Sequence, residues 1–593
     1  MSEPAASYCI HCLKRWSLCF RITAVRLRSL EVHFAPMEVN RPFKLLLVVL
    51  LGVSSRASAQ NPSPAPRDSA SADASHQALT GPPIPPMPAL VLVTSEDVDR
   101  LRTNQLFAGV KRGESMLLRS ASSLTPVLRL PTDGWNASAI APQLLFVTNS
   151  AIPFSQNYGS LWAGRGLSTR TLTGVKLEST HFRLILAPEM ILSANSDWVL
   201  RHDFFVEALP PDRSPYDFPF YVGASTIDQP MRFGNHAIRR IDLGETTAMW
   251  SGDRITLGFS NENEWWGPGI RNAIVLSNNA PGFPHLFLRT RRPLSTRLGD
   301  VEMRWLVGGL TESPYFDTVT TNNTRSLASI AATLQTRSNP NLSFGFARSV
   351  FSTATGWGQV PWRWLDVFAQ TTATRNATTR KDQLFTLFSR WVLPSDGVEL
   401  YVEWGRLRLQ PSLRDFLIAP NHTQGYTVGL QWRGPLWHEG SFRLQGETTQ
   451  LEQSATFRDG PLPSWYNSTR VIQGYTNRGE MLGASIGPGA SSQFFAVDYL
   501  KTPWRLGIFA GRIRWNEDVH DNYGFPAYAS LCNYDVSLYG GLRGARSGVL
   551  GTLVADLTFQ TRRNAFFQNA GGCPLDRRLD IHNVTLAISF SPH

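Results

Sequence analysis

The chain has 593 residues, of which 17% are charged and 11% are aromatic. Soluble proteins usually carry about a quarter of charged residues, and only one N-terminal segment approaches the run of about 18 apolar residues that a membrane-spanning helix needs. The formal net charge of +11 comes from basic residues spread without a polybasic block, which argues against nucleic-acid binding. Few charges, many aromatic residues and no spanning helix in the body of the chain are typical of a membrane β-barrel.

Residues 37–59 have the pattern of a secretory signal peptide. A basic start precedes an apolar core at Leu45–Val53, and Ala57-Ser58-Ala59 supplies the small residues of a cleavage site. Because such a signal opens a chain, we expect Met37 to be the true start. Residues 1–36 are then a mis-assigned N-terminal extension.

The next two segments precede the strands. Residues 60–90 are rich in Pro, Ser and Ala, which predicts a disordered linker. Residues 91–150 read as a periplasmic helical or plug segment. Within it, Thr94 or Ser95 is placed to cap a helix that opens with two acidic residues, and a further helix is expected over Gly113–Ser120.

Residues 151–593 show the alternation of strands that are apolar on one face. In the segment 398–404, apolar residues at the even positions alternate with Glu399, Tyr401 and Glu403. A soluble sandwich also alternates, but its polar face is rich in Lys, whereas here it is rich in Arg, Glu, Gln, Gly and Thr, as in a lumen lined by paired charges. The fold class we predict is an all-β membrane protein, a large antiparallel transmembrane β-barrel with a small N-terminal helical segment.

Turn lengths predict the two ends of this barrel. The last strand, Val584–Phe590, resembles the C-terminal signal read by the barrel-insertion machinery and should run inward. Counting back from it places the short turns at Asn339–Asn341, Pro394–Gly397 and Gly434–Gly440 inside the cell envelope. The long loops then face the cell exterior; they are residues 353–382, 410–423, 452–490, 514–532 and 562–578.

The cysteines divide into two groups. Cys532 and Cys573 fall in two neighbouring outer loops, and we predict that they form a disulfide, which an oxidising compartment permits. Two separate thiols are the alternative. The other three cysteines lie in the N-terminal extension and are assigned no role. We predict no metal site and no cofactor, because no ligand spacing stands out.

Residues 261–284 form the most distinctive stretch of the chain. Trp265 and Trp266 run into Gly267-Pro268-Gly269, which stops regular structure and predicts a shaped loop. Indole rings can stack on a sugar ring, and Arg271, Asn278 and Asn279 can bind its hydroxyl groups. The alternative is that the Trp pair only anchors the loop against the barrel wall.

A second aromatic and basic stretch lies in the long loop 452–490. Its aromatic side chains could stack on pyranose faces and its arginines could pair with uronate carboxylates. The candidate residues of this stretch are Trp465, Tyr466, Arg470, Tyr475 and Arg478.

The loop 261–284 resembles the signature of the Wzi-type capsule assembly family, outer-membrane barrels that hold capsular polysaccharide at the cell surface. Further segments are similar to that family in order along the chain. They are Asn157–Gly166, Ile227–Gly234, residues 400–430 and Gln473–Gly479, followed by Ile486-Gly487-Pro488. Together they span roughly residues 150–490.

The resemblance implies an eighteen-stranded barrel with a lectin-like, non-catalytic function. It implies an outer-membrane protein of a Gram-negative bacterium that binds and anchors capsular or exopolysaccharide. The expected partners are this polysaccharide, outer-membrane lipid and the insertion machinery, with no nucleic acid, and the barrel is expected to be a monomer.

Two other functions remain open from the sequence. A porin or substrate-specific channel would use the same barrel, and it differs in having a lumen that loops and helices leave open. An enzyme is suggested by Gly483-Ala484-Ser485-Ile486-Gly487, which spells G-x-S-x-G. That motif requires a helix after the turn, and Pro488-Gly489 and a strand follow instead, which argues against catalysis by Ser485.

Overall fold

The computed structural model describes most of the chain from residue 87 onward. The described residues are 87–107, 115–126, 134–198, 213–214, 216, 226–369, 380–409, 412–436, 440–454, 464–522, 534–567 and 579–593. Among these residues, no helix combines the length and the apolar character needed to cross a membrane.

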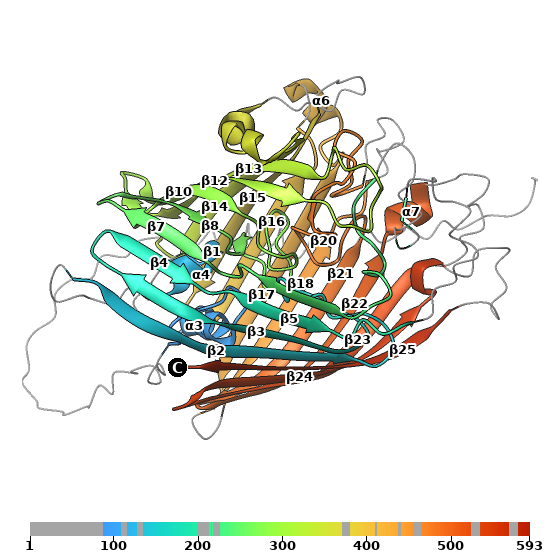
Figure 1. The fold of residues 1–593 in the computed structure, drawn as a ribbon. Helices are drawn as coiled ribbons and strands as arrows, with labels where there is room; N and C mark the ends of the chain where they lie inside the picture. Colours follow the sequence, from blue (N-terminus) through green and yellow to red (C-terminus); the bar gives the residue numbers. More distant parts are fainter. Residues whose placement is uncertain are drawn as a thin grey trace, which may run out of the picture. The chain divides into compact units, whose positions relative to one another are not determined.

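The described strands form one closed antiparallel barrel (Figure 1). Three barrel strands are interrupted, as β4 with β5, β6 with β7 and β10 with β11, so the 21 barrel segments among the described residues make eighteen strands. The segments are β2 (Asn136–Asn149), β3 (Gly166–Glu178), β4 (Phe182–Leu186), β5 (Glu189–Ser193), β6 (Ile238–Asp242), β7 (Thr247–Ser251), β8 (Ile255–Ser260), β10 (His285–Thr290), β11 (Leu294–Ser295), β12 (Gly299–Thr311), β13 (Thr324–Thr336), β14 (Leu342–Thr353), β15 (Lys381–Leu393), β16 (Val398–Arg406), β17 (Gln424–Pro435), β18 (Ser441–Gln450), β21 (Ser491–Lys501), β22 (Trp504–Trp515), β23 (Asp535–Gly548), β24 (Gly551–Arg563) and β25 (Ile581–Pro592).

The remaining described elements are short. They are α3 (Glu96–Asn104), α4 (Ala121–Leu124), α6 (Leu413–Ile418), α7 (Glu517–Asn522), the 3-10 helices η4 (Trp357–Gln359), η5 (Pro361–Phe368) and η7 (Ala565–Phe567), and the strands β1 (Leu118–Ser120), β9 (Glu264–Trp266), β19 (Thr476–Asn477) and β20 (Glu480–Met481).

Alternation along each strand creates the two faces of the barrel. On β16, Glu399, Tyr401 and Glu403 are buried inside, whereas Val402 is exposed outside. The outer face carries exposed apolar side chains on strand after strand, which is the surface that lipid requires. Examples are Phe146, Leu257, Leu286, Phe344, Leu387, Leu430, Phe495, Leu506, Leu542, Phe559 and Leu586. The predicted fold class, an antiparallel transmembrane β-barrel, is confirmed.

The barrel has a short-turn end and a long-loop end. The turns at residues 339–341 and 394–397 lie at the end that carries the C-terminus, together with the tight turns that join β21 to β22 and β23 to β24. The connections of ten or more residues, such as 261–284, 354–380 and 451–490, leave from the opposite end. Short and long connections therefore alternate as the sequence predicted.

Two expectations about the N-terminal part are wrong. The barrel begins at Asn136 and not near residue 151, because β2 pairs with both β3 and the last strand, β25, and closes the barrel. The described part of Gly113–Ser120 is not helical, because Leu118–Ser120 forms β1 and pairs with β9, with Leu118 opposite Trp266. The first helix, α3, does open with Glu96 and Asp97 after Ser95.

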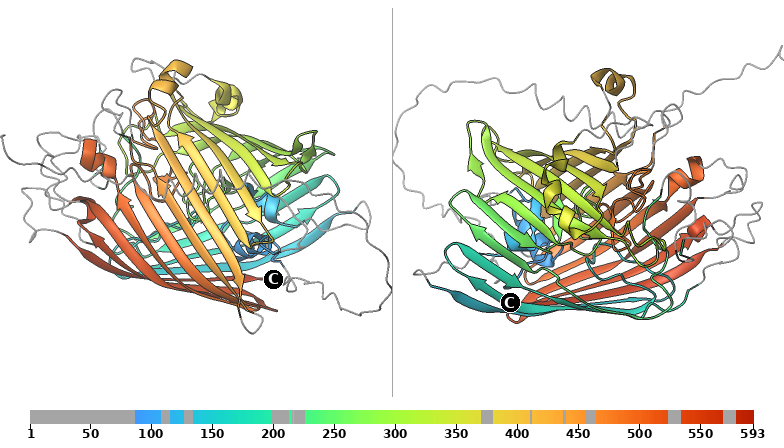
Figure 2. Two further views of the ribbon diagram at one scale, coloured as in Figure 1. Left: turned by 180° about the vertical axis from the view of Figure 1, so that it is seen from behind. Right: turned by 45° about the horizontal axis from the view of Figure 1, so that its top comes forward.

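Helices α3 and α4 lie within the ring of strands, near the short-turn end (Figures 1 and 2). Toward the long-loop end, the loops 261–284 and 464–490 meet inward-facing wall residues in one large hydrophobic core. That core contains Trp266, Phe283, Trp465, Tyr466 and Tyr475. Described helices thus occupy the interior of the barrel near the short-turn end, and described loops occupy it toward the long-loop end.

Candidate functional site

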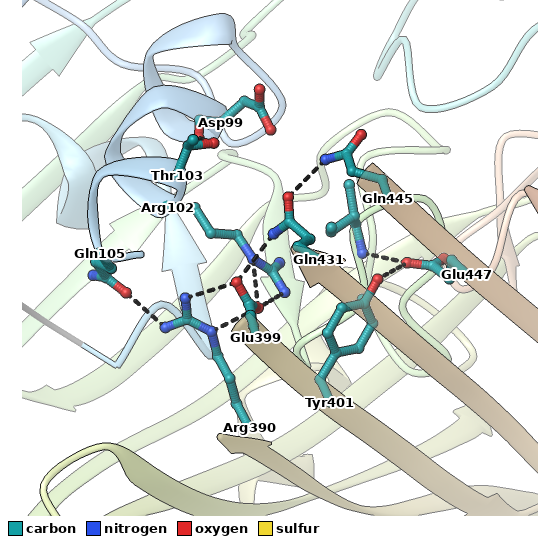
Figure 3. Close-up of polar contacts among 12 residues, drawn as sticks. Asp99, Arg102, Thr103, Gln105, Arg390, Glu399, Tyr401, Gln431, Gln445 and Glu447 are labelled. Atoms are coloured by element: carbon teal, nitrogen blue, oxygen red, sulfur yellow. Dashed lines mark hydrogen bonds and ion pairs between the residues drawn. The ribbon is translucent and has the colours of Figure 1, made fainter. Parts of the chain in front are cut away.

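Ion pairs hold α3 to the barrel wall. Arg102 Nε donates to Glu399 Oε1 at 2.9 Å, and Arg390 on β15 donates to the same oxygen at 2.9 Å (Figure 3). Arg443 on β18 pairs with Asp99 at 2.8 Å, and Arg505 on β22 pairs with Glu96 at 2.6 Å. The helix therefore contacts β16, β18 and β22 through charges. Arg102, Glu399 and Arg443 are almost entirely buried, whereas Glu96 and Asp99 are half-buried.

The paired charges expected on the lumen face are present in the structure. Glu399 pairs with Arg102 and Arg390, while Arg443 pairs with Asp498 at 2.8 Å as well as with α3. Buried charges need such partners because desolvation is costly. These contacts make α3 a plug inside the lumen.

Two wall carboxylates receive the loop 261–284. Glu447 on β18 accepts hydrogen bonds from the backbone N–H groups of Ile270, Arg271 and Asn272 at 2.7–3.1 Å. Glu403 on β16 accepts from the backbone N–H of Ile274 at 3.2 Å. The loop thus turns into the lumen, where strand carboxylates satisfy its backbone donors.

The Trp pair is buried by this arrangement. Trp265 is 1% exposed and Trp266 is 0% exposed. Trp266 Nε1 donates to Glu264 at 2.9 Å, and the guanidinium of Arg119 lies 5.1 Å from the Trp265 ring. Trp266 offers no face to a sugar, so its predicted stacking is corrected, and Trp265 borders only the internal cavity beside the plug that is described below. The pair anchors the loop inside the barrel.

The second aromatic set is buried for a related reason. Tyr466 stacks on Tyr475 with ring centroids 6.0 Å apart, and its hydroxyl donates to Ile274 O and accepts from Ala484 N, both at 2.9 Å. Trp465 Nε1 donates to Gln424 O at 3.2 Å. These side chains bind the two long loops together, and their predicted contact with sugar is corrected in the same way.

The other five predicted site residues lie in several places. Asn278 is buried and donates to Thr94 Oγ1 and Asn157 O, both at 2.9 Å. Half-buried Asn279 and Arg271 face two different cavities, described below.

The two arginines of the later stretch are engaged within the protein. Arg478 donates to Asp242 at 2.7 Å, and Arg470 donates to Lys381 O at 3.4 Å. Burial lowers the pKa of Arg470. The structure therefore does not bring the ten predicted residues together into one surface site.

A cavity of about 300 Å³ lies beside the plug. It is lined by the start of α3, by strands β22 to β25 and by loop residues. Arg271 is held over the Phe494 ring at 4.7 Å at its edge. Its other notable lining residues are Tyr158, Phe509, Tyr539, Arg543 and Asp556.

A second cavity, of about 160 Å³, lies at the long-loop end, and we name it the mouth pocket. Five half-buried aromatic side chains line it, and they come from four different parts of the chain: Phe154 and Trp162 from the loop between β2 and β3, Phe233, Trp515 and Phe566. Polar groups complete the lining; they are Gln229, Asn279, Glu480, Ser485, Asn516, Gln560 and Arg562.

Among the lining residues of the mouth pocket, sequence reasoning chose only Asn279 as a sugar-binding residue. Trp162 and Phe233 lie in the segments 157–166 and 227–234, which carried the family resemblance but were not chosen as site residues. Trp515 and Phe566 carried no signal beyond being aromatic residues near strand ends. The pocket depends on loops that are distant in sequence.

The two remaining sequence predictions concern Ser485 and the cysteine pair. Ser485 lies in a loop that leads into β21, and its hydroxyl donates to Asn272 Oδ1 at 3.1 Å. Cys532 and Cys573 lie outside the described residues, so their disulfide stays a prediction.

Comparison with known proteins gives a family match over part of the chain. Residues 234–500 match the family of the capsule assembly protein Wzi. The resemblance drawn from the sequence is confirmed over this segment, which contains both lumen loops and several residues of the mouth pocket. None of the curated proteins matches the chain.

Several solved barrel structures are similar to this one. Wzi from Escherichia coli, described as an outer-membrane protein involved in group 1 capsule assembly and a carbohydrate-binding β-barrel, has 11% identity and a TM-score of 0.49 over 76% of this chain and 83% of its own. BamA from Haemophilus ducreyi has 10% identity and a TM-score of 0.31 over 83% and 77%. OccK5 from Pseudomonas aeruginosa has 10% identity and a TM-score of 0.35 over 76% and 98%.

Proposed function

We propose that this protein is an outer-membrane capsule assembly protein that binds capsular polysaccharide and anchors it at the cell surface without catalysis. The observation that carries the proposal is the match of residues 234–500 to the Wzi capsule assembly family. That segment supplies the loops packed in the lumen and part of the mouth pocket. The proposed orientation has the long loops facing the cell exterior, where polysaccharide would meet them.

The packing of the lumen supports an anchor over a channel. The α3 plug pairs with strands on several sides, and the core formed by the two long loops fills the level above it. Water-filled barrels keep a polar open lumen. A barrel filled in this way is suited to holding a large polymer at its mouth while blocking passage of solutes.

The apolar outer face supports the proposed partners. Its exposed side chains fit outer-membrane lipid, and the final strand β25, with Val584, Leu586 and Phe590 in alternation, fits a substrate of the barrel-insertion machinery. The eighteen strands close on themselves, so the barrel needs no second copy to remove an edge. We therefore propose a monomer.

Polysaccharide retention in an encapsulated host tests the proposal. Cell-bound and released polysaccharide are measured in a strain that lacks the gene, and in the same strain carrying the wild-type gene as a control. We expect the deletion to release polysaccharide into the medium while total synthesis stays constant. Unchanged retention would contradict the anchor, and stepwise ion conductance of the purified protein in a planar bilayer would favour the channel.

A further inference from the structure

Glu480 is an unusual carboxylate in this barrel. It lines the mouth pocket and is only 9% exposed. Other deeply buried carboxylates, such as Glu399 and Glu447, accept several hydrogen bonds from side chains or backbone. Glu480 accepts no hydrogen bond and makes no ion pair with any residue that the structure describes.

The cations nearest to Glu480 are already engaged. Arg478 and Arg240 both pair with Asp242, each at 2.7 Å. Arg562, which also lines the pocket, makes two hydrogen bonds to Asp535 at 2.6 and 2.8 Å. A buried polar group without a partner is costly, so an uncommitted carboxyl group at the edge of a cavity indicates a place where a ligand supplies the missing contacts.

The backbone holds Glu480 in place. Arg478 and Gly479 both have positive φ, +52° and +83°, and form the two-residue turn between β19 and β20. Arg478 N donates to Thr311 O at 2.7 Å, which ties this hairpin to the end of β12. A Cβ at position 479 would lie 3.0 Å from Phe233, so glycine allows the hairpin to pack against an aromatic wall of the pocket.

The rest of the pocket has the composition of a sugar site. Trp162 packs against Phe233 with ring centroids 5.0 Å apart, and both remain half-buried. Aromatic faces beside amide groups suit a ring that is apolar on its face and carries hydroxyl groups at its edge. The amides are Gln229, Asn279 and Gln560.

The size of the pocket limits what it can hold. Its 160 Å³ corresponds to about five water molecules at about 30 Å³ each. This space fits one sugar residue of a longer chain. The pocket opens at the end of the barrel where the long loops leave, so the rest of a polymer could continue beyond it.

We infer that the mouth pocket is a subsite for one uncharged pyranose residue of the polysaccharide, with its ring against Trp162, Phe233 and neighbouring aromatic side chains and its hydroxyl groups bound by Glu480. The inference rests on the proposed function and narrows the chemistry of its ligand. A uronate residue does not fit this subsite, because the nearby arginines are committed to Asp242 and Asp535 and no uncommitted cation among the described lining residues is left to pair with its carboxylate.

Burial supports this choice, because it raises the pKa of Glu480 to about 8. The carboxyl group is then protonated at neutral pH and can both donate to and accept from hydroxyl groups. A protonated carboxyl has no charge with which to attract a cationic amino sugar, which further favours an uncharged ring.

Tryptophan fluorescence of the full-length protein in detergent tests the inference, because Trp162 and Trp515 line the pocket. The probes are the methyl pyranosides of glucose, galactose, mannose and N-acetylglucosamine, and the sodium salts of glucuronic and galacturonic acid. We expect saturable quenching by at least one uncharged sugar and none by either uronate. Quenching by a uronate alone, or by none of the six probes, would overturn the inference.

Three variants and two controls locate the binding. Trp162→Ala and Glu480→Ala should each weaken the binding of the uncharged sugar by about tenfold or more, while Glu480→Gln should retain most of it because an amide still donates and accepts. Trp357→Ala and Glu452→Gln, which change an exposed Trp and a half-buried Glu outside the lining of the pocket, should bind as the wild type does. Equal binding by Trp162→Ala and Trp357→Ala would place the sugar elsewhere.

Retention of polysaccharide in cells separates the two proposals. If the deletion strain sheds polysaccharide but no uncharged sugar binds in vitro, the anchor stands and this subsite is wrong. If the deletion strain sheds nothing, the proposed function itself fails. Unchanged heat-modifiable mobility of each variant in electrophoresis shows that its barrel has folded.

Discussion

Replacing Glu399 by glutamine (Glu399→Gln) should loosen the helix that plugs the lumen. The carboxylate is fully buried and accepts from Arg102 and Arg390 at 2.9 Å and from Gln431 at 3.0 Å. The variant keeps the size of the side chain but leaves two buried guanidinium groups without their shared negative charge. Breaking a buried ion pair in this way costs about 3–5 kcal/mol.

Equilibrium unfolding in urea, followed by tryptophan fluorescence in detergent micelles, measures the change in the free energy of unfolding. The matched control is Glu302→Gln on β12, since Glu302 lies 3.8 Å from Arg304 and is more exposed. The loss of stability should be smaller there, because Arg304 keeps a closer partner in Glu264 at 2.6 Å. Planar-bilayer conductance provides a second readout, and we expect current through Glu399→Gln and none through the control.

One combination of results would contradict the explanation that ion pairs hold the plug. Stability of Glu399→Gln within about 1 kcal/mol of the control, together with a closed channel, would show that the hydrophobic contacts of the plug suffice. The charges would then serve only to direct the helix into its position.

Four further predictions follow from individual residues. Trp266→Ala should lower the free energy of unfolding by about 3–5 kcal/mol, because the ring is fully buried, and sugar binding per folded molecule, measured by fluorescence titration, should stay unchanged. Gly267→Ala should lower the thermal midpoint in circular dichroism, because φ is +121° and the added Cβ would lie 2.8 Å from a Glu403 oxygen; an unchanged midpoint would contradict this. Burial raises the pKa of Glu480 from 4.5 to about 8, so the folded state binds this proton more tightly than the unfolded chain does. The resulting stability is complete below about pH 4.5 and is lost as the pH rises through 8. Glu480→Gln should therefore flatten the dependence of the thermal midpoint on pH over that window. Peptide mapping by mass spectrometry without reduction should find Cys532 joined to Cys573, and two alkylated thiols would refute the pairing.

The barrel could be predicted because its pattern is local. A period of two along each strand separates the lumen face from the lipid face, and the lengths of turns separate the two ends. Glu399, Tyr401 and Glu403 were correctly assigned to the lumen from this pattern alone. Helix α3 was predictable for a similar reason, since its opening acidic residues follow a suitable capping residue.

The site was harder to predict because burial in a lumen depends on tertiary structure. A loop rich in Trp has the same sequence whether it faces water or folds inward, and Glu447 and Glu403, which draw it inward, lie more than 100 residues later. Leu118–Ser120 was expected to be helical, and its strand forms only because β9 is brought beside it. The mouth pocket joins residues from 154 to 566, whose neighbours in sequence carry no shared pattern.

The closed seam between β2 and β25 has a consequence for how the chain assembles. The first and last strands of the barrel, β2 and β25, meet only when the strands carried by the roughly 430 residues between them have paired. Helix α3 precedes β2, and its acidic residues neutralise arginines on β18 and β22 that point into the lumen. If the barrel closed before α3 entered the lumen, the arginines on β18 and β22 would be enclosed without Asp99 and Glu96. The helix therefore supplies their counter-charges before the seam between β2 and β25 forms.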